Sequence, residues 1–483
     1  MKTEHVLLLI TVAYAVLTVF VATRIILETQ NSVKTSAYLL LLFFMPVLGM
    51  IIYFTFGVNY RKRKLYHNKL LENKSLLASI QLRQDESLVL KKKNIGIIGN
   101  QEDIVDLLVH DLYSPLSDNN ELELLFNGEA KFSRVLEQLE LATHSIHMEY
   151  YIYDDDDIGN RVKEVLIRKA REGVSVRLIY DDFGSHAIRK NIVPELQAAG
   201  VEALPFYEVK FYLLANRYNY RDHRKIIVID GKVGFLGGIN ISDKYINNKP
   251  KQIFWRDTHL MIKGSAVYTL QFLFLSNWNF CTEKPLSLIR DFFPDDIPTE
   301  KKQLVQIAAS GPDSDRPSIM LTFFTAITMA KKELYITSPY FIPSESILVA
   351  LKKAALGGVD VRILVPGESD SAFVNLASRA YYGELLSAGV RIFLYRKGFV
   401  HAKTIIADNN LSIIGTANID FRSFDLNFEA VAIVYDAATN EKMKSAFLED
   451  LYESDEILPD DWMNRSKWIH LLEAIAKLVS PIL

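Results

Sequence analysis

Two stretches of the sequence carry the same reactive side chains at the same spacing. Each holds a histidine, a lysine two positions later, an aspartate and an asparagine: His223, Lys225, Asp230 and Asn240 in the first, and His401, Lys403, Asp408 and Asn418 in the second. In both copies 17 positions separate the histidine from the asparagine. Two histidines can supply the nucleophile and the general acid of a two-step displacement at phosphorus, while lysine and asparagine side chains stabilise the charge on the phosphoryl oxygens.

The residues around each motif predict how the chain positions these groups. The apolar runs after Lys225 and Lys403 predict buried strands, in which side chains two positions apart point the same way. Each histidine should therefore project with its lysine toward one site, and the aspartates end the strands. The glycines before each asparagine let the backbone pass close to its neighbours. We assign both histidines, both lysines and both aspartates to catalysis, and the two asparagines to the substrate phosphate.

The segment that holds these motifs is a repeat. Helices are expected at residues 132–143 and 161–171 around a strand at 145–153, and again at 320–331 and 346–355 around a strand at 333–342. Strands that alternate with helices of this length predict mostly parallel sheets covered by helices. The predicted fold is α/β, with two similar domains in tandem at residues 95–295 and 296–483. Each half supplies one histidine, which implies pseudo-twofold symmetry.

The first sixty residues differ from the rest in their charge. Residues 1–60 contain five charged side chains, and two uncharged runs lie at residues 6–23 and 35–60. Each run is long enough to cross a hydrocarbon core of about 30 Å as a helix. Pro46 lies inside the second run, where we expect a kink rather than a break. The sequence therefore predicts a hairpin of two transmembrane helices in residues 1–60, in preference to a cleaved signal peptide and a buried soluble helix.

The charge behind this hairpin is polarised. Arg61, Lys62, Arg63 and Lys64 follow the second span, and residues 61–94 carry a net charge of +7, whereas residues 95–483 carry −11. Positive residues remain on the cytoplasmic side of a membrane, so two spans predict both termini in the cytoplasm. The basic segment at 61–94 either attracts anionic lipid head groups or only fixes the topology. The acidic body offers no broad surface for nucleic acid.

The duplicated motif resembles the signature of the phospholipase D superfamily, and this resemblance covers nearly all of residues 120–483. The chain is more narrowly similar to the bacterial cardiolipin synthases in its paired N-terminal spans ending at residues 56–63, and in the segments 146–152, 338–343 and 480–483. The resemblance implies two phospholipase D-like domains and a multi-pass enzyme of the bacterial inner membrane, with its catalytic domain on the cytoplasmic side. It implies no metal and no other cofactor, and the single cysteine, Cys281, excludes a cysteine metal cluster.

The resemblance also implies a reaction and its partners. Two phosphatidylglycerol molecules would give cardiolipin and glycerol through a phosphatidyl-histidine, so the partners are phosphatidylglycerol and other anionic membrane lipids. Spacing leaves open which histidine is the nucleophile; in the family the N-terminal copy usually supplies it, which implies His223 as nucleophile and His401 as acid and base. Asp257 and Glu429 match family acids that orient the histidines, although 34 residues separate His223 from Asp257 and 28 separate His401 from Glu429.

Other functions stay open at this point. A phospholipase D-type hydrolase would use water as the acceptor, and the two motifs do not distinguish water from an alcohol. A nuclease-like phosphodiesterase is opposed by the acidic body and the apolar N-terminus, and a non-catalytic lipid-binding scaffold by the two intact motifs. A homo-oligomer is compatible with the sequence. Residues 468–482 carry apolar side chains at helical spacing, for which packing onto the domain is favoured over lying in the membrane interface.

Overall fold

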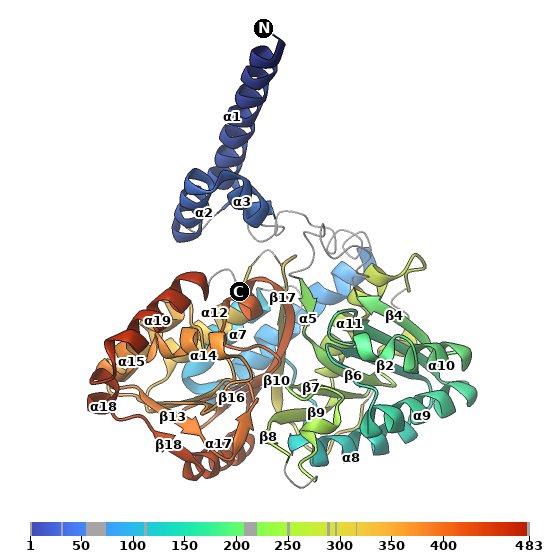
Figure 1. Ribbon diagram of the computed structural model, residues 1–483. Coiled ribbons are helices and arrows are strands. Elements are labelled where there is room, and N and C mark those ends of the chain that lie inside the picture. The colour runs from blue at the N-terminus through green and yellow to red at the C-terminus, as the bar shows by residue number, and fades with distance from the viewer. Residues whose placement is uncertain are drawn as a thin grey trace. The chain divides into compact units, whose positions relative to one another are not determined.

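The computed structural model describes residues 2–29, 32–54, 74–110, 114–206, 220–248, 252–286, 290–294, 297–314 and 316–480. The chain divides into two compact units. An N-terminal unit holds the first three helices, and a body contains almost all of the chain after residue 64 (Figure 1).

The N-terminal unit consists of one long helix and two short ones. They are α1 (Lys2–Glu28), α2 (Ser32–Phe44) and α3 (Pro46–Ile52). Between α2 and α3, Met45 leaves the helical conformation with φ −138° and ψ 69°. A residue before proline is disfavoured in the helical region, whereas proline itself is favoured at the first position of a helix. Pro46 therefore ends one helix and begins the next.

Helix α3 folds back along α2 and returns the chain to the end of α1. The rings of Tyr38 and Tyr53 meet edge to face with centroids 5.6 Å apart. The two helices approach so closely that a Cβ atom on Gly49 would lie 2.7 Å from the backbone of Leu42. The Tyr53 hydroxyl donates a hydrogen bond to Oε2 of Glu28, at the last residue of α1, over 3.2 Å. The chain thus leaves this hairpin beside the point at which it entered.

One of the two predicted transmembrane helices is found. Among the described residues, α1 is the one helix long and apolar enough to cross a membrane. Helix α2 has 13 residues and rises about 20 Å, short of the about 30 Å of a hydrocarbon core. The predicted second span over residues 35–60 is therefore wrong as a continuous helix, and the expected kink at Pro46 is a break. Residues 55–64, with the basic run at 61–64, lie outside the described residues.

The first domain of the body is built on a seven-stranded sheet. Its strands are β1 (Asn120–Phe126), β2 (Ser145–Tyr150), β3 (Ser175–Asp181), β4 (Glu202–Phe206), β6 (Lys225–Ile229), β7 (Val233–Gly237) and β9 (Thr258–Gly264), and their order is β1-β9-β7-β6-β2-β3-β4. Strands β2, β3 and β4 run parallel and the other pairs run antiparallel. The predicted parallel arrangement is confirmed for these three strands only.

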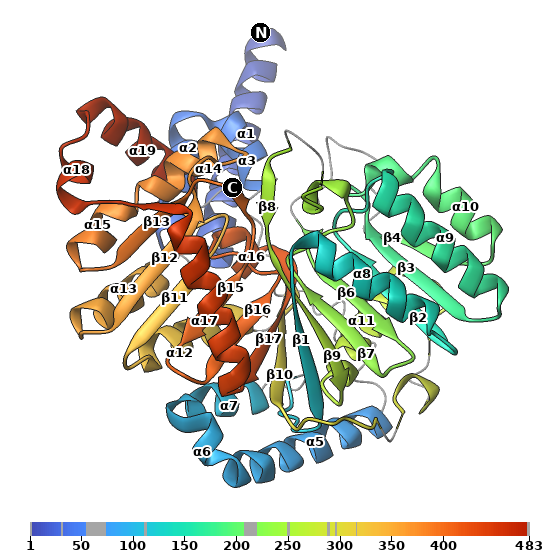
Figure 2. The same cartoon turned by 90° about the horizontal axis from the view of Figure 1, so that it is seen from below.

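Helices cover both faces of this sheet. They are α8 (Asn127–Glu140), α9 (Asp157–Arg171) and α10 (Ile192–Ala198) on the outer face, as Figure 2 shows, and α11 (Val267–Cys281) on the inner face. Side chains alternate between the faces along each strand. On β2, Ile146 and Met148 join the core under the outer helices, whereas His147 stacks on Phe274 of α11 with ring centroids 4.6 Å apart.

The second domain repeats this seven-strand order and adds an eighth strand at its edge. Its strands are β10 (Leu304–Ser310), β11 (Glu333–Thr337), β12 (Asp360–Pro366), β13 (Arg391–Tyr395), β15 (Thr404–Ala407), β16 (Leu411–Gly415), β17 (Asn427–Tyr435) and β18 (Ser454–Glu456), in the order β10-β17-β16-β15-β11-β12-β13-β18. Helices α12 (Ser318–Met329), α13 (Glu345–Leu356), α14 (Ala372–Arg379), α15 (Tyr382–Ser387), α16 (Phe421–Asp425), α17 (Ala437–Tyr452), α18 (Pro459–Met463) and α19 (Lys467–Val479) surround it. The predicted duplication is confirmed.

The two domains share a hydrophobic core where their inner faces meet. Val228 of β6 and Leu270 of α11 from the first domain pack in one cluster with Ile406 of β15 and Phe447 of α17 from the second. Burial of apolar surface stabilises this contact at about 25 cal/mol per Å². The pseudo-twofold pair therefore behaves as one body, and side chains of the two domains can combine in one site.

A helical segment before the first sheet packs on the second domain. It contains α5 (Lys74–Lys93), α6 (Ile95–Ile98) and α7 (Glu102–Val109). Ile104 and Leu108 of α7 lie in the same core as Phe323 of α12. Residues 95–110, which the predicted boundary at residue 95 assigns to the first domain, thus contribute to the core of the second.

Candidate active site

Two short pairs of parallel strands join the domains and carry the histidines. In one pair, β5 (Arg221–Asp222) of the first domain lies beside the start of β17 of the second. In the other, β8 (Phe254–Arg256) of the first domain lies beside β14 (Gly398–Val400) of the second. His223 follows β5, and its backbone N–H donates to the carbonyl of Phe428 over 3.0 Å. His401 follows β14, and its N–H donates to the carbonyl of Arg256 over 2.7 Å.

This strand pairing places a carboxylate from each domain on the histidine of the other. Nδ1 of His223 lies 2.9 and 3.0 Å from the two carboxylate oxygens of Glu429. Nδ1 of His401 lies 2.7 Å from Oδ2 of Asp257. Both carboxylates are completely buried. A carboxylate on Nδ1 fixes the proton there and leaves Nε2 as the nitrogen available for chemistry.

The exchange of partners explains the unequal spacings in the sequence. The two spacings in the sequence are counted between each histidine and the acid of its own copy. In the structure each histidine is hydrogen-bonded to the acid of the other copy instead. The informative register is across the strands, where Phe428 pairs with Asp222 and Val400 with Arg256. One residue further along the first pair of strands, His223 lies opposite Glu429. One residue further along the second pair, His401 lies opposite Asp257. The two halves of the site therefore have the same geometry despite the longer loop in the first copy.

The two lysines lie in the same buried site as the histidines. Nζ of Lys225 donates to the backbone carbonyl of His223 over 2.6 Å, and Nζ of Lys403 donates in the same way to the carbonyl of His401. Burial lowers the pKa of Lys225 to about 7 and that of Lys403 to about 8. The lysine charges and, above all, burial lower the pKa of both histidines below the usual value, which favours neutral imidazoles in the free protein.

Burial shifts the pKa values of the two carboxylates in the opposite direction, upward. Burial raises the pKa of Asp257 to about 6 and that of Glu429 to about 7, while the nearby lysines oppose this shift. Glu429 also accepts a hydrogen bond from the amide of Asn427 over 3.3 Å. Two carboxylates, two lysines and two histidines thus share one buried volume. An anionic phosphodiester that enters this volume favours the protonated forms of the lysines and of an imidazole.

The motif aspartates lie away from these groups. Asp230 and Asp408 stand at the far ends of their strands, roughly 23 Å of extended chain from the histidines, with φ of 53° and 51°. The Asp230 carboxylate accepts hydrogen bonds from the backbone N–H groups of Thr143, His144 and Ser145 at 2.8–2.9 Å. The Asp408 carboxylate accepts hydrogen bonds from the backbone N–H groups of Lys331, Lys332 and Glu333 at the start of β11, at 2.8–3.4 Å. The structure does not bring these two aspartates into the site; they fasten the strand that carries each lysine to the neighbouring strand.

Replacing Asp230 by asparagine is therefore expected to reduce stability rather than chemistry. Asparagine tolerates the left-handed backbone, so the change leaves the backbone in place. It removes the charge and turns an amide NH2 group toward backbone N–H groups that an oxygen had accepted. We expect the free energy of unfolding to fall by about 2–3 kcal/mol, measured by denaturant unfolding, with kcat per folded molecule within a fewfold of the parent. A kcat loss of 10²-fold or more in folded protein would place Asp230 in the chemistry.

The two motif asparagines differ from each other. Nδ2 of Asn240 donates to the Tyr245 hydroxyl over 2.7 Å, and its Oδ1 accepts from the backbone of Ile152. Asn418 is buried, and its Oδ1 has no hydrogen-bond partner among the described residues. A buried amide oxygen without a partner is costly, which is consistent with a group that a ligand satisfies. Contact of either asparagine with a substrate phosphate stays a prediction.

The residue after the motif glycine differs between the copies for a structural reason. The second copy has Thr416 there, whose hydroxyl donates to Glu429. The first copy has Gly238, where a Cβ atom would lie 2.7 Å from Oδ2 of Asp257 and nearer still to Oδ1. A side chain at 238 would push Asp257 off His401.

Replacing Gly238 by alanine is expected to lower kcat by about 10²-fold, because displacement of a positioning group by about 1 Å has effects of that size. The matched control is Gly96→Ala, where an added Cβ meets nothing within 4 Å. Steady-state rates of the two purified variants, with thermal unfolding to confirm folding, are the measurement. Equal rates for both variants would contradict the role of this glycine.

Sequence reasoning missed several residues around the histidines. Tyr151 meets His223 edge to face at 4.9 Å, while Tyr245 and Trp255 approach His401 at 5.7 and 5.4 Å. These aromatic rings limit the access of water to the imidazoles. Their sequence signal is weak, since aromatic residues beside a strand usually indicate a core.

A buried lysine supports the loop of Asn240. Lys131 lies on the inner side of α8, and its Nζ donates to the backbone carbonyls of Ile239 and Asn240 over 3.0 and 3.4 Å. Burial lowers its pKa well below the usual value. A lysine between the apolar positions of an amphipathic helix is the signal that could have identified it.

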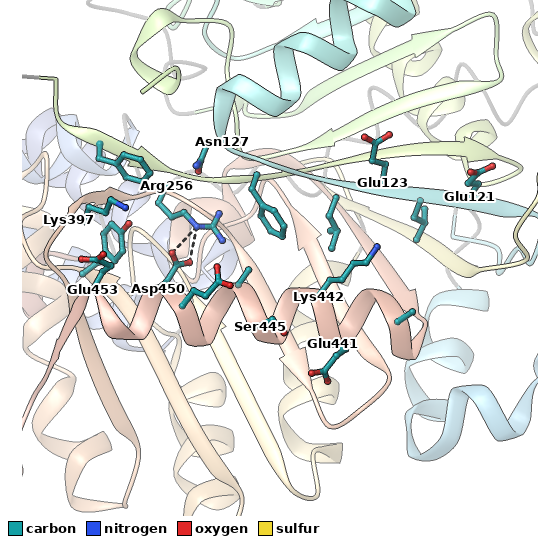
Figure 3. Close-up of a pocket in the computed structure, with 18 of the residues that line it drawn as sticks. Glu121, Glu123, Asn127, Arg256, Lys397, Glu441, Lys442, Ser445, Asp450 and Glu453 are labelled. Carbon is teal, nitrogen blue, oxygen red and sulfur yellow. Dashed lines mark hydrogen bonds and ion pairs between the residues drawn. The ribbon is translucent and has the colours of Figure 1, made fainter. Parts of the chain in front are cut away.

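A pocket of about 1070 Å³ lies between the domains, apart from the catalytic groups (Figure 3). First-domain residues such as Glu123 and Asn127 form one wall and α17 forms the other. Arg256 crosses it to Asp450, with Nε 3.0 Å from Oδ1, and also donates to the carbonyl of Asp257 over 2.8 Å. The ion pair thus holds the strand that carries Asp257 against the second domain.

Comparison with protein families places both halves of this site in one family. Residues 135–260 and 323–451 match the family described as "Cardiolipin synthase, PLD-like domain". The first match contains His223 and the second contains His401. Residues 16–57 match the family described as "Phospholipase_D-nuclease N-terminal".

Individual relatives agree with this over nearly the whole chain. A cardiolipin synthase of Geobacillus sp. (strain WCH70) is 43% identical over 465 residues, covering 96% of this chain and 92% of that protein. A cardiolipin synthase of Listeria monocytogenes serotype 4b (strain F2365) is 39% identical over 483 residues, covering 99% and 98%. The crystal structure of a phosphatidylserine synthase from Haemophilus influenzae Rd KW20 matches 75% of this chain and 95% of its own with a TM-score of 0.54. At 15% identity that similarity shows a shared fold.

Proposed function

Because the chain belongs to the cardiolipin synthase family, and is thus a phosphatidyltransferase, we propose that it joins two phosphatidylglycerol molecules into cardiolipin and glycerol through a phosphatidyl-histidine. The observation that carries the proposal is the pair of histidines, each held at Nδ1 by a buried carboxylate of the other domain. Two equivalent imidazoles in one anion-attracting site suit a reaction that forms and then breaks a bond to phosphorus.

In the first step, Nε2 of His223 attacks the phosphorus of one phosphatidylglycerol. The nitrogen–phosphorus bond forms as the bond to the glycerol oxygen breaks. His401 takes up a proton at Nε2 when the anionic substrate binds and gives that proton to the glycerol oxygen. Lys225 and Lys403 stabilise the negative charge on the phosphoryl oxygens. Glu429 stabilises the positive charge that His223 acquires, because its carboxylate already accepts the Nδ1 proton.

In the second step, His401 acts as the base. It takes the proton from a terminal hydroxyl of the second phosphatidylglycerol, whose oxygen attacks phosphorus while the bond to His223 breaks. Cardiolipin leaves, and His401 is protonated again for the next turnover. Asp257 holds His401 in one orientation through both transfers. The proton that His401 gives up in the first step is thus returned to it in the second step.

Incubation of the purified full-length protein with phosphatidylglycerol vesicles tests this function. Equal amounts of cardiolipin and glycerol support phosphatidyl transfer to an alcohol. Phosphatidic acid as the sole lipid product would replace the proposal by a hydrolase that uses water as acceptor. The double variant His223→Ala/His401→Ala is assayed in parallel. It should form neither product, which would show that the products come from this site.

The proposed location is the cytoplasmic face of the bacterial inner membrane, with phosphatidylglycerol and other anionic lipids as partners. The apolar helix α1 supports membrane anchoring. The basic run Arg61–Lys64 supports a cytoplasmic position for the chain that follows it. Two complete crossings would also put the N-terminus in the cytoplasm; one crossing puts it on the opposite side.

We expect one crossing, because α3 returns the chain to the end of α1. A cysteine at Thr3 in a Cys281→Ser background should react with a membrane-impermeant maleimide on intact spheroplasts. A cysteine at Leu141, in the body, should react only after permeabilisation. If both positions react only after permeabilisation, the N-terminus is in the cytoplasm, and the segment that follows α1 crosses the membrane a second time.

A further inference from the structure

Helix α19 turns an apolar face away from the protein. Trp468, Leu471, Leu472, Ile475 and Leu478 are 75%, 48%, 52%, 49% and 77% exposed. At 3.6 residues per turn these five side chains fall within an arc of about 120°. Sequence reasoning favoured packing of the apolar positions in residues 468–482 onto the domain. Ala476 does lie in the core of the domain, whereas Trp468, Leu471, Leu472 and Ile475 are exposed. A contiguous apolar stripe with this degree of exposure marks an interaction surface.

The opposite face of α19 is held on the domain largely by charged groups. Glu473 is buried and accepts hydrogen bonds from Arg465 over 2.7 Å and from Arg379 of α14 over 3.4 Å. Lys477 pairs with Glu384 of α15 over 3.1 Å. These ion pairs fix the rotation of the helix. The helix is therefore attached with its charged side inward, the reverse of a helix that packs on a core through its apolar side.

We propose that this face of α19 lies in the lipid–water interface of the bilayer that holds the substrate. Helices with one apolar face that includes tryptophan, leucine and isoleucine lie parallel to the membrane with that face among the upper acyl chains. Trp468 is the residue type enriched at the interface, and Lys467 beside it can contact anionic head groups.

The anchoring of the chain favours lipid over a second protein as the occupant. Helix α1 keeps the chain at a bilayer, so the body stays at a high effective concentration near the membrane surface. Under that condition even a modest affinity of the stripe for lipid is enough for docking. Each leucine transferred from water to hydrocarbon changes a partition constant by about tenfold or more.

The position of α19 connects docking with the active site. Helix α19 packs against α14, which begins directly after Asp370 and Ser371. The Asp370 carboxylate accepts a hydrogen bond from Tyr340 over 2.6 Å, and its charge acts on Lys403. A docked α19 would thus hold this side of the site at the level of the lipid head groups, where phosphatidylglycerol presents its phosphate.

Depth-dependent quenching of a fluorescent label tests the proposal without reference to the reaction. In full-length protein with Cys281→Ser, reconstituted in phosphatidylglycerol vesicles, an NBD label is placed at Leu472→Cys or Leu478→Cys. The control is Leu141→Cys, which is 64% exposed in the first domain. We expect doxyl lipids to quench positions 472 and 478 but not 141. Quenching of all three by aqueous iodide alone, or shielding of 472 and 478 from both quenchers by protein, would overturn the proposal.

A second measurement addresses the consequence for activity. Leu472→Glu should lower cardiolipin formation from vesicles by about tenfold and leave the rate with short-chain, monomeric phosphatidylglycerol unchanged. Leu141→Glu should change neither rate. Equal loss with both substrates would show that the substitution damages the domain, and loss with neither would show that docking has no role in turnover. Cardiolipin formation from the monomeric substrate does not require docking. It therefore tests the proposed function, on which this experiment rests, separately from the membrane contact of α19.

Discussion

Replacing His223 by alanine is expected to lower kcat for cardiolipin formation by about 10⁴-fold or more, because the change removes the proposed nucleophile. His223 is held between the Glu429 carboxylate at Nδ1 and the ring of Tyr151, so Nε2 is the free nucleophilic nitrogen. Burial keeps its pKa low, and the neutral form required for attack dominates. Cardiolipin and glycerol release by purified protein measure the effect, with thermal unfolding to confirm that the variant folds.

The variant His401→Ala separates the two histidines. With a p-nitrophenyl phosphatidyl ester, the leaving group needs no proton, so His401→Ala should still release one equivalent of p-nitrophenol. The second step should then stall, because no base remains to activate the acceptor alcohol. Mass spectrometry should find the phosphatidyl group on His223. A phosphatidyl group on His401 in the His223→Ala protein, and none on His223, would exchange the two roles.

The repeated fold could be predicted from sequence because its signal is local. Alternating strands and helices in both halves predicted two similar α/β domains, and the strand order of one domain recurs in the other. The apolar runs after Lys225 and Lys403 became buried strands that present each lysine beside its histidine. A continuous apolar run can be recognised from neighbouring residues alone, so the sequence is enough to predict the strand.

Contacts across the repeat could not be predicted in this way. The partnership of Asp257 with His401 depends on the parallel pairing of β8 with β14, which are far apart in the chain. Asp230 holds its strand in place because its carboxylate accepts hydrogen bonds from the backbone of residues 143–145. The motif does not indicate that this backbone lies beside Asp230. The break at Met45 comes from Pro46, but the return of α3 along α2 depends on the close approach at Gly49, a tertiary contact that hydropathy does not report. In α19, ion pairs of Glu473 decide which face is inward.

The cross-domain pairing predicts which step each orienting acid serves. Asp257→Asn and Glu429→Gln should each lower kcat for cardiolipin formation by about 10³–10⁴-fold, the size of the effect when an orienting carboxylate becomes an amide. An amide can hold the imidazole in the wrong tautomer and leaves its positive charge without a counter-ion. Asp230→Asn is the control, since it also turns a hydrogen-bonded carboxylate into an amide, but at an aspartate outside the site.

The p-nitrophenyl ester distinguishes the two acids. Because Asp257 orients His401, Asp257→Asn should release the first equivalent of p-nitrophenol at nearly the parent rate and then accumulate phosphatidyl-His223. Because Glu429 orients the nucleophile, Glu429→Gln should slow that first release itself. If each acid served the histidine of its own copy, the two behaviours would be exchanged. Neither domain then completes a catalytic histidine alone, and the parallel strand pairs β5–β17 and β8–β14 are what make the site from two half-sites.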